Sequence, residues 1–337
     1  MLRALVLAIA LAIVAMLATA IPVSRREARE TTVDGTWTTA ASLNEVRAEV
    51  AAAELDGTLY TAGGFDARGS DLASLEAYDP ALDRWELRAP LQEGLNHLGV
   101  AALNGVLYVA GGYSGGKPTS SLYAYDPATD TWTVRAELPL RRAAHALVAA
   151  NGRLFAVGGV GDEPGVTLAY EPKADQWERR ASMPTLREHL GAAVVNDQVY
   201  VIGGRWADRG NLTTAEMYDS LADTWSALAP MPTARGGLAA ATLNGKVHVV
   251  GGEAFGPNRT FPEHEVYDPA TDTWSVAPSL PTPRHGLGAA SYAGKLYVIG
   301  GGPSAGLSAS SLVEVFEPAD RPSTRRPAIH FVLSCGA

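Results

Sequence analysis

The chain has 337 residues, of which 47% are hydrophobic and 19% charged, and its 35 glycines and 21 prolines favour an all-β globular domain with many tight turns. A formal net charge of -9 gives nucleic-acid phosphate no general reason to bind, so nucleic acid is not expected as a partner. The single cysteine, Cys335, excludes an intramolecular disulfide and a thiolate metal cluster.

A long apolar segment begins the chain. Residues 4–23 are almost uninterruptedly apolar and are followed by Ser24-Arg25-Arg26. Ala18-Thr19-Ala20 matches a signal-peptidase site, which predicts that residues 1–23 hold a signal peptide cleaved after Ala20. The segment also reaches the roughly 20 residues that span a bilayer, so a retained N-terminal membrane anchor is the alternative. Both interpretations predict an extracytoplasmic domain, either periplasmic, secreted or anchored, and contact with a membrane is expected only through such an anchor.

Two sets of residues recur along the rest of the chain at the same intervals of 45 to 49 residues. Paired glycines preceded by apolar residues occur at Gly63-Gly64, Gly111-Gly112, Gly158-Gly159, Gly203-Gly204, Gly251-Gly252 and Gly300-Gly301. Tryptophans occur at Trp37, Trp85, Trp132, Trp177, Trp225 and Trp274. Because two different residues keep one spacing, the chain is expected to repeat a supersecondary unit.

Residues 91–138 illustrate the unit. Two apolar segments, Gly99 to Leu103 and Val106 to Ala110, are joined by Asn104-Gly105, which is a strong hairpin signal. After a loop, Leu122 to Tyr125 predicts a third strand, and Thr131 to Arg135 predicts a fourth that carries the recurring tryptophan. Each unit is therefore expected to be a four-stranded antiparallel sheet.

The recurring motif resembles the kelch repeat. It has a double glycine, then an aromatic-acid-proline triplet such as Tyr78-Asp79-Pro80, and a tryptophan seven residues after the aromatic. The resemblance covers residues 34–318 and implies an all-β, six-bladed kelch-type β-propeller with one repeat per blade. A monomeric domain is expected, with residues 319–337 as a C-terminal tail.

The first and last units are incomplete in complementary ways. Trp37 has no aromatic residue seven positions before it, and Phe316 has no tryptophan seven positions after it. The N-terminal strand around Trp37 is therefore predicted to complete the last blade and close the ring.

Successive loops of an antiparallel sheet alternate between its two ends. The variable loops after the paired glycines therefore share one face with the connections between blades, and recognition is expected on this loop-rich face. An arginine stands 16 residues before the first glycine of the pair in five of the six units, with Leu95 in the other. These arginines and three histidines near the same level are predicted to surround the central channel: Arg47, Arg142, Arg187, Arg235, Arg284, His145, His189 and His285.

Such an arginine-lined central pocket favours an anionic or polyhydroxylated ligand, because guanidinium groups pair with carboxylates and with neighbouring hydroxyls. The alternative is structural, with each arginine satisfying loop carbonyls between blades. Trp206 lies outside the repeat pattern, in the loop from Arg205 to Asn211, and is predicted to be an exposed residue on which a ligand stacks.

Two classes of function remain open. The first is a non-catalytic binding module that presents the loop-rich face to a protein or glycan ligand. The second is a sugar-acting enzyme resembling the kelch-type sialic-acid mutarotases, with an acid-base group from Glu45, Glu93 or Glu188.

No catalytic residue, cofactor or metal ligand is predicted. The seven histidines show no paired spacing. Radical-copper oxidases resembling galactose oxidase need a cysteine cross-linked to tyrosine, whereas Cys335 lies beyond the last repeat.

Overall fold

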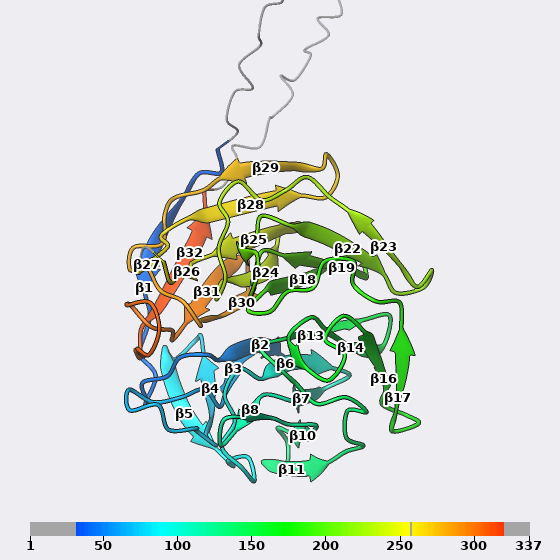
Figure 1. Ribbon diagram of the computed structural model, residues 1–337. Helices are drawn as coiled ribbons and strands as arrows, with labels where there is room; N and C mark the ends of the chain where they lie inside the picture. The colour runs from blue at the N-terminus through cyan, green and yellow to red at the C-terminus, as the bar shows by residue number, and fades with distance from the viewer. Residues whose placement is uncertain (1–31, 257, 320–337) are drawn as a thin grey trace, which may run out of the picture. The chain divides into compact units, whose positions relative to one another are not determined.

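The computed structural model describes residues 32–256 and 258–319, so the predicted leader and residues 320–337 of the predicted tail lie outside the described part of the chain. The regular elements in these ranges are β-strands (Figure 1). No helix there is long and apolar enough to cross a membrane. Within the described residues the longer strands form six four-stranded antiparallel sheets, which confirms the predicted six-bladed propeller.

Each blade is described here from its innermost strand outward. The first blade contains β2 (Ala51–Leu55), β3 (Thr58–Ala62), β4 (Leu75–Asp79) and β5 (Arg84–Arg88). The second contains β6 (Gly99–Leu103), β7 (Val106–Ala110), β10 (Leu122–Asp126) and β11 (Thr131–Val134). The third contains β13 (Ala146–Ala150), β14 (Arg153–Val157), β16 (Thr167–Glu171) and β17 (Gln176–Arg180).

The remaining blades follow the same order. The fourth contains β18 (Gly191–Val195), β19 (Gln198–Ile202), β22 (Ala215–Asp219) and β23 (Thr224–Ala227). The fifth contains β24 (Ala239–Leu243), β25 (Lys246–Val250), β28 (His264–Asp268) and β29 (Thr273–Val276). The sixth contains β30 (Gly288–Tyr292), β31 (Lys295–Ile299), β32 (Val313–Pro318) and β1 (Gly35–Thr39).

The strands differ in side-chain size according to their depth in the blade. Innermost strands are rich in alanine and glycine, as in the Gly-Val-Ala-Ala-Leu of β6, because six of them converge on the axis. The second strands carry larger residues that are almost fully buried, such as Leu107 and Tyr108 in β7. Apolar side chains of neighbouring blades pack together; Tyr60 and Tyr125, from the first and second blades, share one cluster. The core is thus a series of layers between blades.

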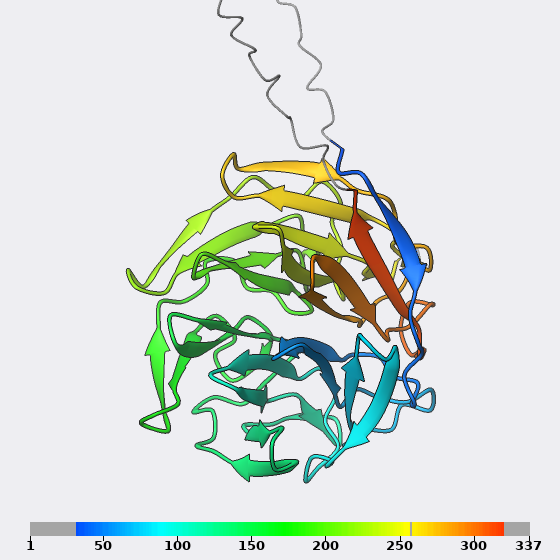
Figure 2. The ribbon, with the colours of Figure 1, turned by 180° about the vertical axis from the view of Figure 1, so that it is seen from behind.

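Trp37 closes the ring as predicted. β1 pairs antiparallel with β32 and places Trp37 opposite Phe316. Figure 2 shows the two strands side by side, although they come from opposite ends of the propeller sequence. The indole Nε1 of Trp37 donates to the carbonyl of Pro278 at 2.8 Å, just as Trp85 donates to Ala41 at 2.9 Å in the first blade.

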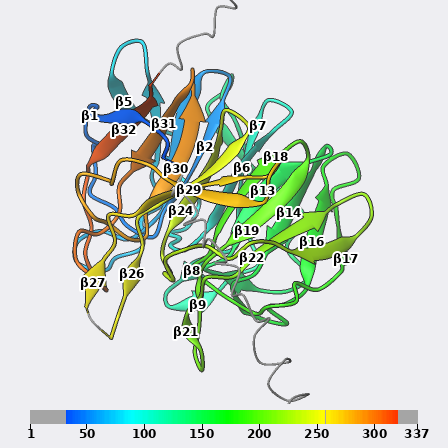
Figure 3. The same ribbon diagram turned by 90° about the horizontal axis from the view of Figure 1, so that it is seen from above.

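Short two-stranded ribbons extend the loop-rich face. Four two-stranded ribbons occur among the described residues: β8 (Tyr113–Ser114) with β9 (Lys117–Pro118), β12 (Arg142–Ala143) with β15 (Val160–Gly161), β20 (Arg205–Trp206) with β21 (Gly210–Asn211), and β26 (Glu253–Ala254) with β27 (Arg259–Thr260). Figure 3 shows β8, β9, β21, β26 and β27 on the same side of the blades. Their first strands begin directly after the paired glycines, except for β12.

Candidate functional site

The six innermost strands enclose a central cavity of about 540 Å³. Most of its wall is alanine, glycine and other small residues, so the wall itself offers little chemistry. At the end nearest the loop-rich face the wall includes His145 and three further ionisable residues, Glu49, His97 and His189. We call this end the mouth of the cavity.

The three residues occupy equivalent positions in a ring of six, one from each blade, which we call the mouth ring. Its members have left-handed backbone φ angles between 52° and 64°: Glu49, His97, Ala144, His189, Gly237 and Gly286. From His97 onward, the N–H of each member donates to the carbonyl of the member before it, at 2.9 Å from His97 to Glu49 and 2.8 Å from Gly286 to Gly237. The N–H of Val50 donates to Gly286 at 3.3 Å and completes the circle.

Left-handed backbone is costly for large side chains and cheap for glycine. Three blades place glycine or alanine in the mouth ring, whereas the other three hold a glutamate and two histidines in the unfavourable conformation. Residues held in such conformations cluster at binding and catalytic sites. The mouth ring is therefore where a functional centre is expected in this fold.

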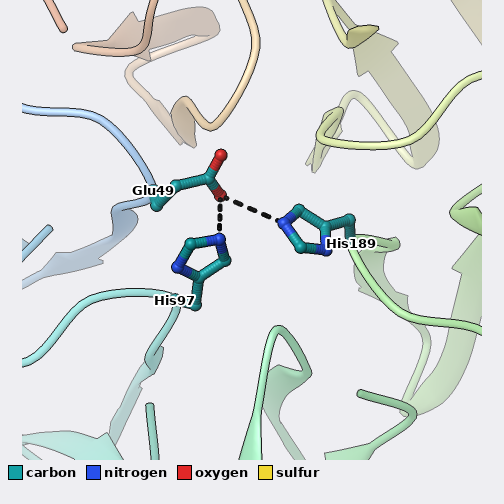
Figure 4. Close-up of side chains that lie close together, drawn as sticks. All are labelled: Glu49, His97 and His189. Carbon is teal, nitrogen blue, oxygen red and sulfur yellow. Dashed lines mark ion pairs between the residues drawn. The ribbon is translucent and has the colours of Figure 1, made fainter. Parts of the chain in front are cut away.

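The side chains of the mouth ring converge on the carboxylate of Glu49 (Figure 4). Its Oε2 lies 3.2 Å from Nε2 of His97 and 3.7 Å from Nε2 of His189. Its Oε1 lies 3.2 Å from Nδ1 of His285. Burial alone would raise the pKa of the Glu49 carboxyl, but the charged ring of His285, which lies against Oε1, lowers it below its usual range. Glu49 is thus a buried carboxylate held in its ionised form.

A circuit of charged groups surrounds this carboxylate. Nδ1 of His189 lies against the carboxylate of Glu188, whose other oxygen accepts from Nε of Arg205 at 2.8 Å. Arg205 donates in turn to Glu253 at 2.6 Å, and Glu253 lies 3.5 Å from His285.

The histidines at the mouth differ in their charge state. Burial lowers the pKa of His97 and lowers that of His189 still further, which keeps both rings neutral. Burial also acts to lower the pKa of His285, but the Glu49 and Glu253 carboxylates raise it above its usual value. The mouth therefore carries three carboxylates against the guanidinium of Arg205 and the imidazolium of His285.

Aromatic rings flank the mouth on the loop-rich face. The ring of Tyr113 meets His97 edge-on at 5.4 Å between centroids, and Phe65 lies 6.2 Å from the same histidine. Phe255 is exposed and stacks with the guanidinium of Arg205 at 4.4 Å. Trp206, the predicted stacking residue, is partly buried in β20, next to Arg205. The charged centre is thus bordered by apolar surfaces.

The arginines predicted to surround the channel lie elsewhere. Arg47, Arg142, Arg187, Arg235 and Arg284 are fully buried, and none of them lines the cavity. Four pair with a glutamate on the third strand of the same blade: Arg47 with Glu76, Arg187 with Glu216, Arg235 with Glu265, and Arg284 with Glu314. Arg142 donates instead to the carbonyls of Val166 and Glu163. Their positions match the structural alternative, because a guanidinium buried between strands needs a carboxylate or carbonyl partner.

The three predicted histidines are placed differently from one another. His189 belongs to the mouth ring, and His285 contacts Glu49 from behind it. His145 borders the cavity, but its ring packs against Gly99 and Gly111 between blades. Neither of its ring nitrogens has a hydrogen-bond partner among the described residues. Its place corresponds to that of leucine in four other blades, so it belongs to the packing rather than to the charged centre.

Sequence reasoning missed Glu49, His97, Arg205 and Glu253. The signal that identifies the first two is the position two residues after the recurrent arginine, where Glu49 and His97 align with Ala144 and Gly286. A position that varies between glycine and ionisable residues in otherwise similar repeats indicates function rather than packing. Of the glutamates predicted as acid-base groups, Glu188 joins the charged circuit, whereas Glu45 contacts Arg47 and Glu93 accepts from Ser121 and Tyr123.

Comparison with known proteins adds the following. A family model described as "KLHDC2/KLHL20/DRC7 Kelch-repeats domain" matches residues 166–317, and one described as "Kelch motif" matches residues 47–92, 95–139 and 141–184. No curated protein matches the chain. The solved structure titled "Structure of YjhT" superimposes with a TM-score of 0.70 and covers 82% of this chain and 97% of that chain, at 18% sequence identity. A likeness at this identity shows the fold alone.

Proposed function

Because the chain belongs to the kelch-repeat β-propeller family, a scaffold whose function resides in its loops and channel, we propose that it binds a neutral carbohydrate at the mouth of its central cavity. The observation that carries the proposal is the mouth ring, with its charged centre and flanking aromatics. A cavity of about 540 Å³ is of the size that takes a small ligand rather than a protein surface.

The charges at the mouth favour a neutral ligand. Glu49, Glu188 and Glu253 outnumber Arg205 and His285, so an anionic sugar would be repelled. Sugar hydroxyls can donate to these carboxylates and accept from the guanidinium, and a sugar ring can stack on an aromatic side chain. The anionic ligand expected from the arginines loses its support, because those guanidinium groups are already paired.

We place this activity outside the cytoplasm. The support for it is the apolar segment of residues 4–23 followed by Arg25 and Arg26. Fractionation of cells that express the full-length chain tests this part: recovery of the protein in the cytoplasmic fraction, uncleaved, would refute it.

Binding is tested with the purified full-length chain on a glycan array, followed by calorimetry on any sugar that binds. Replacing Tyr113 or Trp206 by alanine is expected to weaken binding roughly two- to tenfold, the range of an aromatic stacking contact. Tyr292→Ala is the matched control, because Tyr292 lies at the other end of the innermost strand β30. Binding of no neutral sugar, or equal losses in all three variants, would refute the proposal.

One observation favours an enzyme as the second candidate. A carboxylate and two neutral imidazoles meet at one point, and sugar mutarotation needs a group that takes a proton and a group that gives one. Mutarotation of the bound sugar, followed by NMR, distinguishes the two functions. Acceleration that disappears in Glu49→Gln indicates the enzyme, and binding without acceleration indicates the binding module.

A further inference from the structure

Three side chains of the mouth ring have the geometry of a metal site. Oε2 of Glu49 is 3.2 Å from Nε2 of His97 and 3.7 Å from Nε2 of His189, and the three atoms lie within 4.8 Å of one another. Ligand atoms held about 2.0–2.1 Å from a tetrahedral zinc ion are roughly 3.3 Å apart. The observed separations are therefore close to those that an ion bound between the three atoms requires.

The surroundings of His97 orient its ring for this role. The amide nitrogen of Asn96 donates to Asp71, which leaves the amide oxygen of Asn96 facing Nδ1 of His97. Because that oxygen only accepts, Nδ1 must carry the proton. The other nitrogen, Nε2, faces a carboxylate oxygen of Glu49 and can bind an ion in place of a proton, since metal binding displaces protons from its ligands.

His189 repeats the arrangement from another blade. Its Nδ1 lies against the Glu188 carboxylate, which also accepts only, so Nε2, the nitrogen that faces Glu49, is again the one available to an ion. Arg205 holds Glu188 in place from its other side. Metal-binding histidines in proteins commonly donate their second nitrogen to a carboxylate or carbonyl in this way. Two imidazole nitrogens and a carboxylate oxygen therefore converge on a point that suits a cation.

We propose that Glu49, His97 and His189 bind one divalent transition-metal ion, with Zn²⁺ as the ion of choice, at the mouth of the central cavity. Imidazole with carboxylate favours such ions over Ca²⁺ and Mg²⁺, which prefer sets of oxygen ligands. The other members of the mouth ring are Ala144, Gly237 and Gly286, whose small side chains leave the cavity side of the ion open. An ion with three protein ligands and an open position can coordinate a further ligand.

Two features separate this site from the adjacent Glu49–Glu253–His285 group, which also lies within ligand distance. His285 places Nε2 3.0 Å from the carbonyl of Ser304, so that nitrogen donates, and Nδ1 faces both carboxylates. Neither His285 nor Glu253 lines the cavity, and Glu253 already accepts from Arg205 and from the N–H of Gly306. His285 instead holds Oε1 of Glu49 and turns Oε2 toward the other two histidines.

The test is zinc binding by the purified full-length chain after treatment with a chelator and dialysis. Native mass spectrometry is expected to show one Zn²⁺ per chain, and Co²⁺ in its place should give visible absorption bands of a tetrahedral site. His97→Ala and His189→Ala should each raise the dissociation constant for Zn²⁺ by more than about 100-fold, and Asn96→Leu by about 10- to 100-fold. His145→Leu is the matched control and should bind zinc like the original chain.

The outcomes are distinct. No zinc bound above background, or equal binding in His97→Ala and the original chain, would show that Nε2 merely donates to Glu49 and would overturn the inference. If the alanine variants fail to fold, Glu49→Gln replaces them, because it keeps the shape of the side chain while removing its charge. The metal site does not depend on the proposed function: zinc binding without sugar binding refutes only the carbohydrate proposal, and sugar binding in the presence of chelator, with no zinc uptake, refutes only the metal.

Discussion

Trp37 lies directly opposite Phe316 in the sixth blade, with the two ring centroids 5.3 Å apart. The pair joins the first strand of the propeller to the last, so its contacts link the two ends of the ring. The indole also donates to Pro278 in the connection between the fifth and sixth blades. Loss of the Trp37 side chain is therefore expected to weaken the closure of the ring as well as the sixth blade itself.

Trp37→Ala is expected to destabilise the protein by about 3–5 kcal/mol, the range for truncation of a large aromatic residue in a packed site. Urea denaturation followed by circular dichroism measures the loss. A chain beginning at residue 41, which lacks β1, should be less stable still, whereas one beginning at Ser24 should unfold like the original. Equal midpoints for these two shortened chains would contradict the closure.

The sixth blade, which takes its outermost strand from the other end of the propeller sequence, also differs from the first blade in one hydrogen-bonded contact. In the first blade Asp83 accepts from the hydroxyl of Tyr78 at 2.6 Å and from the N–H of Ala41 at 2.7 Å. The equivalent positions of the sixth blade are Phe316, which has no hydroxyl, and Pro278, which has no N–H. The sixth blade therefore lacks both of the groups that donate to the aspartate in the first blade, so it needs no aspartate at this position.

The buried arginine pairs are expected to stabilise the blades and not to bind a ligand. Arg235→Leu leaves the Glu265 carboxylate buried and unpaired, at a cost of about 3–5 kcal/mol. Arg235→Leu with Glu265→Leu should recover much of the loss, because a hydrophobic pair often replaces a buried ion pair at little cost. The second blade already has Leu95 and Tyr123 at these positions. Thermal melts measure both effects, and weaker sugar binding by a folded double variant would contradict this assignment.

His145→Leu is expected to stabilise the protein by about 1–3 kcal/mol, because it removes a buried ring with two unpaired nitrogens and restores the leucine of four other blades. Burial, with a smaller contribution from Arg142, lowers the pKa of His145 from 6.5 to about 3. In this pH range the His145 ring therefore binds a proton in the unfolded chain but not in the folded chain. His145 does not reduce the free energy of unfolding above about pH 6.5, and it reduces this free energy increasingly as the pH drops from there toward about 3.

The same substitution should thus flatten the acid dependence of stability. Between neutral pH and about pH 5, His145 accounts for a loss of about 2 kcal/mol that His145→Leu should not show. Urea midpoints at the two pH values measure the difference. An identical decrease in the original chain and the variant would show that His145 is protonated in the folded state.

Two glycines of the mouth ring provide a matched pair. A Cβ at Gly286 would lie 2.5 Å from Oε1 of Glu49, whereas a Cβ at Gly237 would meet nothing closer than 3.4 Å. Both have a left-handed φ, so alanine should cost each about 1–2 kcal/mol in backbone strain. Only Gly286→Ala should also displace the Glu49 carboxylate and weaken ligand binding at the mouth, as measured by calorimetry. Equal binding by the two folded variants would show that the position of Glu49 does not matter.

The fold was accessible from the sequence because each repeat carries local signals. The turn Asn104-Gly105 and the spacing of Trp85 and Trp132 depend on contacts within one blade or with its neighbour. Ring closure was accessible as well, since Trp37 and Phe316 are the two halves of one interrupted motif. Periodicity therefore determined both the number of blades and their connection.

The site was only partly accessible, because its residues come from several blades and meet through the ring geometry. Glu49 and His97 stand out only when the repeats are aligned, and their meeting at one point follows only from the arrangement of the blades about one axis. The recurrent arginines were predicted to line the channel because they are regularly spaced. Regular spacing in a propeller instead reflects packing that the blades have in common. The partner glutamate is absent where Leu95 replaces the arginine, but it is also absent in the third blade, where Leu168 stands at the glutamate position and Arg142 donates to carbonyls instead.

A crystal structure of the full-length chain with its tightest-binding sugar tests most directly whether function resides in the mouth ring. Sugar hydroxyls are expected within hydrogen-bond distance of Glu188 or Arg205, and a sugar ring is expected against Tyr113. A sugar bound on the outer strands, or at the opposite end of the cavity near Tyr292, would contradict it.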